Sequence, residues 1–208
     1  MANAPAPSNV GSRYWTVPVG RALIALVPAA IITFNRDHSA EFGLLVFGSF
    51  ALATGLLLVV TSARTLQAPI DRNLFLTQGI ASLIAGGIAL GFHAAGYGFF
   101  LFSVSVWAAV TGFLELYAGI RVPQRALPAK DWLFTGLGGA VLALLFVLLP
   151  PNPVVSVGIF GAYLVFLAVF LPIGGLSLKW APPAQSRASS HSPQAVSTGT
   201  APNDSDSQ

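Results

Sequence analysis

Residues 42–63 read FGLLVFGSFALATGLLLVVTSA, a stretch without a single acidic, basic or amide side chain. As an α-helix these residues would be about 33 Å long. The hydrocarbon core of a bilayer is about 30 Å thick and needs roughly 17–25 apolar residues to cross it. This stretch therefore predicts a membrane-spanning helix, bounded by Glu41 on one side and Arg64 on the other.

Five further apolar runs follow the same rule, and they occupy 17–34, 74–92, 97–120, 132–149 and 154–178. Inside all six runs the only acidic or basic side chains are Arg21 and Glu115. Charged residues make up 8% of the chain, against about 25% in soluble domains. We therefore predict an all-α membrane protein with six transmembrane helices over residues 15–180. A flexible lead (1–14) precedes them, and a disordered cytoplasmic tail (181–208), rich in Ser, Pro and Ala, follows.

The basic residues predict the orientation of the six spans. Only Arg36 falls on one side of the membrane, between the first two spans. The other nine fall on the opposite side: Arg13, Arg21, Arg64, Arg72, Arg121, Arg125, Lys130, Lys179 and Arg187. Short loops rich in Lys and Arg stay in the cytoplasm, so both termini are expected inside. Because the positive charge is explained as a topology signal, we expect no nucleic-acid partner. The Ala, Gly and Pro content suits a bacterium with a GC-rich genome, so we expect the bacterial plasma (inner) membrane.

An internal repeat of about 57 residues runs through the chain. Gly20, Gly79 and Gly136 stand near the starts of the first, third and fifth spans. In the even spans, 47–55 aligns with 104–112 and with 160–168. This predicts three helical hairpins in parallel orientation. Inverted repeats are the more frequent arrangement in alternating-access transporters, although parallel repeats occur there too. The symmetry argues against a transporter without excluding one.

Small residues at four-residue spacing predict where helices pack, because close approach drives helix association in lipid. The candidates are Gly79, Ala81, Ala85, Gly87 and Gly91 in the third span, Gly112 in the fourth, and Gly136 and Ala140 in the fifth. Such a face can form a homodimer or an internal contact, and we favour internal packing.

Glu115 is the most informative single residue. It lies six residues before Arg121, within the inner leaflet, where a carboxylate must be paired, protonated or hydrated. Arg21, Gln78 and Thr135 lie at a similar depth, so we predict a polar intramembrane cluster of these four side chains. The cluster is either a proton-responsive or ion-binding site, or a salt bridge that fixes helix register; we favour the salt bridge.

Other chemistry is not indicated. The chain has no cysteine, and His38 and His93 near the outer face match no zinc spacing. We find no nucleophile motif and no phosphate-binding loop, so we expect neither an enzyme nor a bound metal or cofactor.

Three stretches carry a resemblance to a known family: 19–23 (VGRAL), 78–81 (QGIA) and 111–118 (TGFLELYA). Together with three parallel hairpins they resemble the HdeD-like acid-resistance membrane proteins, over about residues 17–178. The last stretch is similar to the family's Gly-x-x-Glu pattern near the end of an even helix. The third repeat departs from it, because no glutamate matches Glu115, and the long tail is a second departure.

The resemblance implies a six-helix inner-membrane protein linked with acid or envelope stress. We therefore expect a non-enzymatic structural or accessory component of stress tolerance. The alternative is a small transporter or proton-coupled permease that uses Glu115. The expected partners are the lipid bilayer and either another membrane protein or a second copy of this chain.

Overall fold

The computed structural model describes residues 16–65, 69–121, 127–148 and 150–179. These residues form six α-helices: α1 (Thr16–Phe34), α2 (Ala40–Thr65), α3 (Pro69–Gly91), α4 (Tyr97–Arg121), α5 (Leu127–Leu148) and α6 (Pro153–Lys179). The described part contains no β-strand, which confirms the all-α prediction. The proposed lead (1–14) and tail (181–208) lie outside the described residues.

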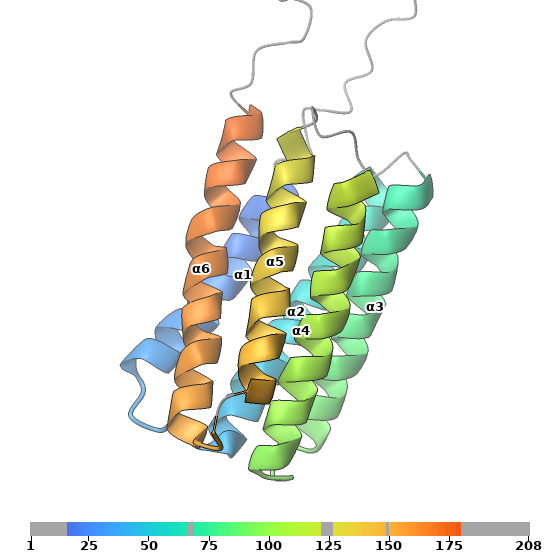
Figure 1. The fold of residues 1–208 in the computed structure, drawn as a ribbon. Helices are drawn as coiled ribbons and strands as arrows, with labels where there is room; N and C mark the ends of the chain where they lie inside the picture. Colours follow the sequence, from blue (N-terminus) through green and yellow to red (C-terminus); the bar gives the residue numbers. More distant parts are fainter. Residues whose placement is uncertain (1–15, 66–68, 122–126, 149, 180–208) are drawn as a thin grey trace, which may run out of the picture.

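The six helices stand side by side as one bundle, and successive helices run in opposite directions (Figure 1). At one end, which we call the hairpin end, the short segments 35–39, 92–96 and 149–152 join α1 to α2, α3 to α4 and α5 to α6. We call the other end, where α1, α3 and α5 begin, the basic end, because Arg72 and Arg121 lie there. Arg36 lies at the hairpin end.

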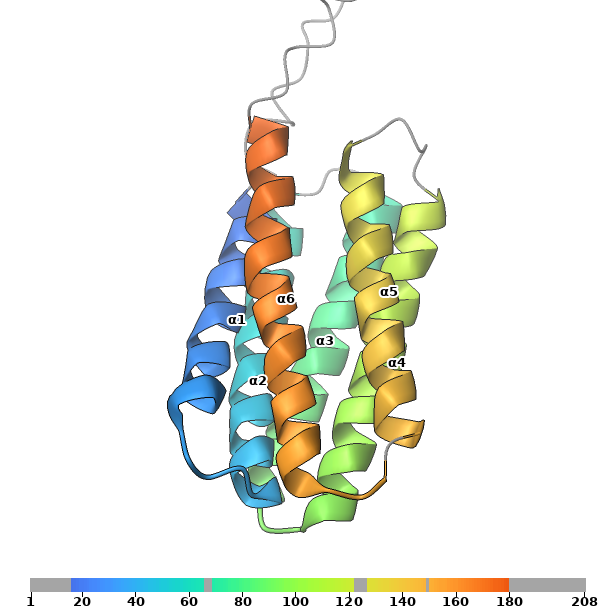
Figure 2. The ribbon, with the colours of Figure 1, turned by 60° about the vertical axis from the view of Figure 1, so that its left-hand side comes forward.

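The most extensive helix contacts are not those within the hairpins. They join α2 to α3, α4 to α5 and α1 to α6, and these pairs stay adjacent when the bundle is turned (Figures 1 and 2). The pairs joined at the hairpin end, α1/α2, α3/α4 and α5/α6, make fewer contacts. The first and last helices are therefore close neighbours, and the bundle closes into a ring.

Glycines explain why α2 and α3 approach so closely. A Cβ added to Gly55 would lie 2.7 Å from the carbonyl oxygen of Gly79, and one added to Gly79 would lie 3.1 Å from that of Gly55. Gly48 and Gly86 make the same reciprocal contact about two helical turns away, at 3.1 and 2.8 Å. A side chain at Gly55 or Gly86 would collide with the backbone of the neighbouring helix, and one at Gly48 or Gly79 would collide with Leu90 or Val59, so glycine allows the two helices to come this close.

The α4/α5 contact also depends on glycines that face each other across the two helices. An added Cβ on Gly112 would lie 3.0 Å from the Gly136 carbonyl oxygen and 3.0 Å from the Ala140 nitrogen. One on Gly136 would lie 2.9 Å from the Gly112 carbonyl oxygen. Gly79, Gly112, Gly136 and Ala140 thus lie at close contacts between helices of the chain.

The prediction of helix packing is wrong for two of the residues, Gly87 and Gly91. Gly87 and Gly91 are exposed, and a Cβ added to either would meet nothing within 4 Å. Successive residues of a helix point about 100° apart. Gly79 and Gly86, seven residues apart, therefore share the face that packs against α2, whereas Gly87 points away from it. Ala81 and Ala85 are only half-buried and line a groove between α3 and α4.

Aromatic rings from the three even helices fill the middle of the bundle. Phe47 contacts Trp107 and Phe160 edge-on, with ring centroids 5.6 and 5.8 Å apart. Phe50 contacts the same two rings at 5.6 and 6.1 Å. Such edge-to-face pairs are favoured by the ring quadrupoles. The centre is therefore packed with side chains rather than left as a channel.

The outer surface is apolar, with large exposed side chains on every helix, Leu23, Leu56, Ile84, Phe113, Leu144 and Val169 among them. Such a surface in a bundle of this kind indicates contact with lipid. Five helices, all except α5, are long and apolar enough to span a bilayer. The apolar part of α5 among the described side chains is Trp132–Leu148, 17 residues, which is the lower limit for a span.

Candidate functional site

A buried cluster of polar side chains lies toward the basic end of the bundle. Arg21 Nη2 on α1 donates a hydrogen bond to Glu115 Oε1 on α4 at 2.5 Å and forms an ion pair with it. Gln78 Nε2 on α3 donates to the same oxygen at 2.7 Å. Arg21, Gln78 and Glu115 are 8%, 3% and 4% exposed. The structure thus brings together three of the four predicted residues, from three different helices.

Arg21 and Glu115 do not come from adjacent helices, because α1 packs against α6 and α2, whereas α4 packs against α5 and α3. The pair therefore connects opposite sides of the ring. In the alignment predicted from the sequence, Glu115 corresponds to Leu58 and Leu171, and both leucines are also buried.

Burial determines what this pair can do. Each buried ion costs several kcal/mol of lost hydration, and the attraction between the ions offsets this only when geometry is good and other hydrogen bonds are made. Here Glu115 receives two donors on a single oxygen. The carboxylate is therefore held as a charge-assisted acceptor, and the two hydrogen bonds together link α1, α3 and α4 at one depth.

Thr135, the fourth predicted member, is buried at 1% exposure on α5. Its hydroxyl donates to the carbonyl oxygen of Trp132, one turn earlier on the same helix, at 3.3 Å. This hydrogen bond lies within α5 and does not join Thr135 to Glu115.

A second buried hydrogen bond was missed from the sequence. Trp107 Nε1 on α4 donates to Ser82 Oγ on α3 at 3.1 Å. Its sequence signal was weak, because a tryptophan in the middle of a span packs as well against lipid as against a neighbour. Thr54 on α2 is also buried, at 3% exposure, and its hydroxyl oxygen has no hydrogen-bond partner among the described groups.

The hairpin end carries a small polar network of its own. The Tyr97 hydroxyl lies 2.9 Å from Ser156 Oγ and accepts a hydrogen bond from the backbone N–H of Asn152 at 3.0 Å. His93 Nε2 lies 3.6 Å from Glu41 Oε1, with both side chains exposed. No three His, Cys, Asp or Glu side chains among the described residues lie in a metal-binding arrangement.

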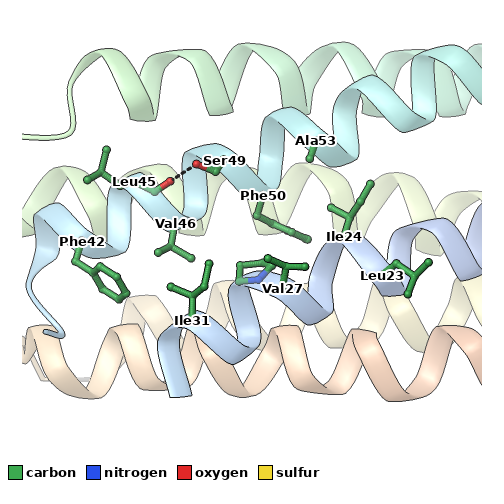
Figure 3. Close-up of a pocket in the computed structure, with 11 residues that line it drawn as sticks. Leu23, Ile24, Val27, Ile31, Phe42, Leu45, Val46, Ser49, Phe50 and Ala53 are labelled. Carbon is green, nitrogen blue, oxygen red and sulfur yellow. Dashed lines mark hydrogen bonds between the residues drawn. The ribbon is translucent and has the colours of Figure 1, made fainter. Parts of the chain in front are cut away.

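Shallow apolar grooves separate the loosely packed helices. The groove between α1 and α2 has a volume of about 600 Å³. Figure 3 shows Leu23, Val27 and Ile31 of α1 facing Phe42, Val46 and Phe50 of α2 across it. Its one polar side chain, Ser49, donates to the carbonyl oxygen of Leu45. Similar grooves lie between α3 and α4 and between α5 and α6. Their linings suit hydrocarbon rather than an ion or a polar solute.

No family model, no curated protein and no solved structure matches this chain. The functional argument therefore rests on the geometry of the bundle itself.

Proposed function

We propose that the chain is a multi-pass protein of the bacterial plasma membrane, with six spans and both termini in the cytoplasm. Five helices meet the length and hydropathy of a span, and α5 lies alongside them in the same bundle (Figure 2). Arg72 and Arg121 lie at one end and only Arg36 is described at the other, which supports a cytoplasmic basic end by the positive-inside rule.

The three hairpins are parallel copies of one unit. Support for this comes from the helix contacts, since equivalent pairs (α2/α3, α4/α5 and α6/α1) are the close ones. Further support comes from the aromatic centre, where the equivalent residues Phe50, Trp107 and Tyr163 contact one another through Trp107.

The protein acts as a non-enzymatic structural or accessory component of the membrane. The observation that carries this proposal is the hydrogen bonding of Glu115. Arg21 and Gln78 hold this carboxylate between the packed aromatic centre and the basic end. A carrier site needs polar groups that face a solute, whereas this carboxylate is turned into a contact between helices. The link to acid or envelope stress rests on the resemblance of 111–118 to HdeD-like proteins, and it predicts that cells without the chain survive acid shock less well.

A flux measurement tests this role against the transporter alternative. Wild-type protein and a Glu115→Gln variant are reconstituted into liposomes that contain a pH-sensitive dye, and a proton gradient is applied. We expect equal and background-level proton entry in both, because contacting aromatic rings of α2, α4 and α6 fill the middle of the described bundle. Proton entry that the wild type supports and the variant loses would establish a proton-coupled carrier instead.

A further inference from the structure

Three side chains on the exposed face of α4 form a column toward the basic end. Phe113, Tyr117 and Arg121 follow one another at four-residue steps, so they share one helix face. The rings of Phe113 and Tyr117 are stacked, with centroids 6.3 Å apart and planes inclined by 20°. The guanidinium carbon of Arg121 lies 5.0 Å from the centroid of the Tyr117 ring. The cation–π contact holds the Arg121 charge at a fixed place on the surface.

A groove begins beside this column. It lies between α4 and α5, has a volume of about 540 Å³ and is lined by Phe113 and Leu116 at the end nearer Arg121. Three alanines, Ala109, Ala140 and Ala143, leave the space that forms it. Its volume falls within the roughly 300–1,000 Å³ of small-molecule sites, and Ser105 is the one polar side chain in its lining.

The depths of the cation and the groove match the parts of a phospholipid. Leu116 lies five residues before Arg121 and Phe113 eight residues before it, about 7.5 and 12 Å along the helix axis. Half of the hydrocarbon core is about 15 Å thick. If Arg121 is at the level of the phosphates, this end of the groove is therefore at the level of the acyl chains.

We propose that this surface binds one anionic phospholipid of the cytoplasmic leaflet, with its phosphate on Arg121 and one acyl chain in the α4/α5 groove. A guanidinium matches phosphate geometry with two parallel hydrogen bonds. The described ion pairs join Arg21 to Glu115 and His93 to Glu41, so no described carboxylate pairs with Arg121. The leaflet follows from the orientation under "Proposed function"; the site itself does not depend on it.

A second copy of the chain fits this groove less well. Two copies inserted in the same direction are related by an axis along the membrane normal, so they would place two Arg121 side chains at the same depth. Like charges brought close together repel, and no described carboxylate on this face offsets them. A lipid phosphate brings the opposite charge.

The test uses the full chain purified in a mild detergent. Native mass spectrometry measures how much dioleoyl phosphatidylglycerol and dioleoyl phosphatidylcholine each variant retains. The variants are Arg121→Gln and Ala109→Leu, which fills the groove. The control for Arg121→Gln is Arg72→Gln, because Arg72 is an exposed arginine of α3 that also lies at the basic end. The control for Ala109→Leu is Ala30→Leu, because Ala30 is an exposed alanine of α1 outside the described grooves.

We expect Arg121→Gln to weaken phosphatidylglycerol retention about tenfold, because it removes charge-assisted hydrogen bonds to the phosphate. Phosphatidylcholine retention changes less with that variant, and Ala109→Leu weakens both lipids, while Arg72→Gln and Ala30→Leu leave them near wild type. Equal effects of Arg121→Gln and Arg72→Gln would overturn the site. So would a dimer that Ala109→Leu dissociates without changing lipid retention.

A cysteine-accessibility measurement separates this proposal from the proposed orientation. Labelling of an Arg125→Cys variant by a membrane-impermeant thiol reagent added outside intact cells would contradict the cytoplasmic assignment. The retention experiment in detergent would still decide whether Arg121 and the groove bind lipid.

Discussion

Removing both members of the Arg21–Glu115 pair is expected to cost clearly less than the sum of the costs of removing each one alone. The atoms Nη2 and Oε1 are 2.5 Å apart, so at an effective dielectric constant of about 20 the gross attraction is about 7 kcal/mol. Loss of hydration offsets most of this, so the intact pair adds little net stability. A single Glu115→Gln or Arg21→Gln substitution, however, leaves the other charge buried and uncompensated, and costs about 3–5 kcal/mol.

The double variant Arg21→Gln/Glu115→Gln buries two neutral amides, which can hydrogen-bond to each other and to Gln78. We expect its loss to fall below the sum of the single losses by about 3 kcal/mol, the upper end of coupling between contacting residues. The free energy of unfolding is measured by equilibrium denaturation in mixed micelles of a mild detergent and sodium dodecyl sulfate.

Arg36→Gln serves as the control, because Arg36 is exposed at the hairpin end, and it should change stability by less than about 0.5 kcal/mol. Strictly additive losses for the two single variants would refute the inference that the pair acts as one unit holding opposite sides of the ring together.

Three further substitutions test the packing and the hydrogen bonds. Gly55→Ala brings a methyl group to 2.7 Å from the Gly79 carbonyl oxygen and should cost about 1–3 kcal/mol in the same denaturation assay; its control, Gly87→Ala, faces open space and should be neutral or slightly stabilising, so equal losses would contradict the α2/α3 contact. Thr54→Val removes a buried hydroxyl without a described partner and should raise the unfolding free energy by about 1 kcal/mol, and a loss of that size would mean that the hydroxyl is satisfied. Trp107→Phe removes the donor to Ser82 and should cost about 1–3 kcal/mol of unfolding free energy. In a Ser82→Ala background most of this cost should disappear, and an undiminished cost there would show that ring packing dominates.

Helix number and the main ion pair could be predicted from the sequence because both follow from strong rules. A run such as 42–63 has no alternative that satisfies its backbone within lipid. A carboxylate at Glu115 needs a partner at its own depth, and Arg21 is the one basic residue inside the predicted spans. The position of Gln78 followed from the same depth argument.

The helix faces were harder to predict. In α3 nearly every position between Gly79 and Gly91 is small or aliphatic, so a four-residue pattern fits several faces equally well. Gly86 is at the contact and Gly87 is outside, a difference of one residue that depends on how α2 is placed. The grooves between α1 and α2, α3 and α4, and α5 and α6 were not predictable either, because they depend on the looser packing of the helices joined at the hairpin end.

The order in which the helices are synthesised differs from the order in which they find their best neighbours. α1 leaves the ribosome first, yet its most extensive contact is with α6, the last helix of the described chain. Before α6 is synthesised, the main helix contact of α1 is its looser contact with α2. Arg21 has no Glu115 to pair with until α4 has been made. The early part of the nascent chain therefore depends on the late part, and a product truncated before Pro153 would expose α1 to the proteases that remove unfinished membrane proteins.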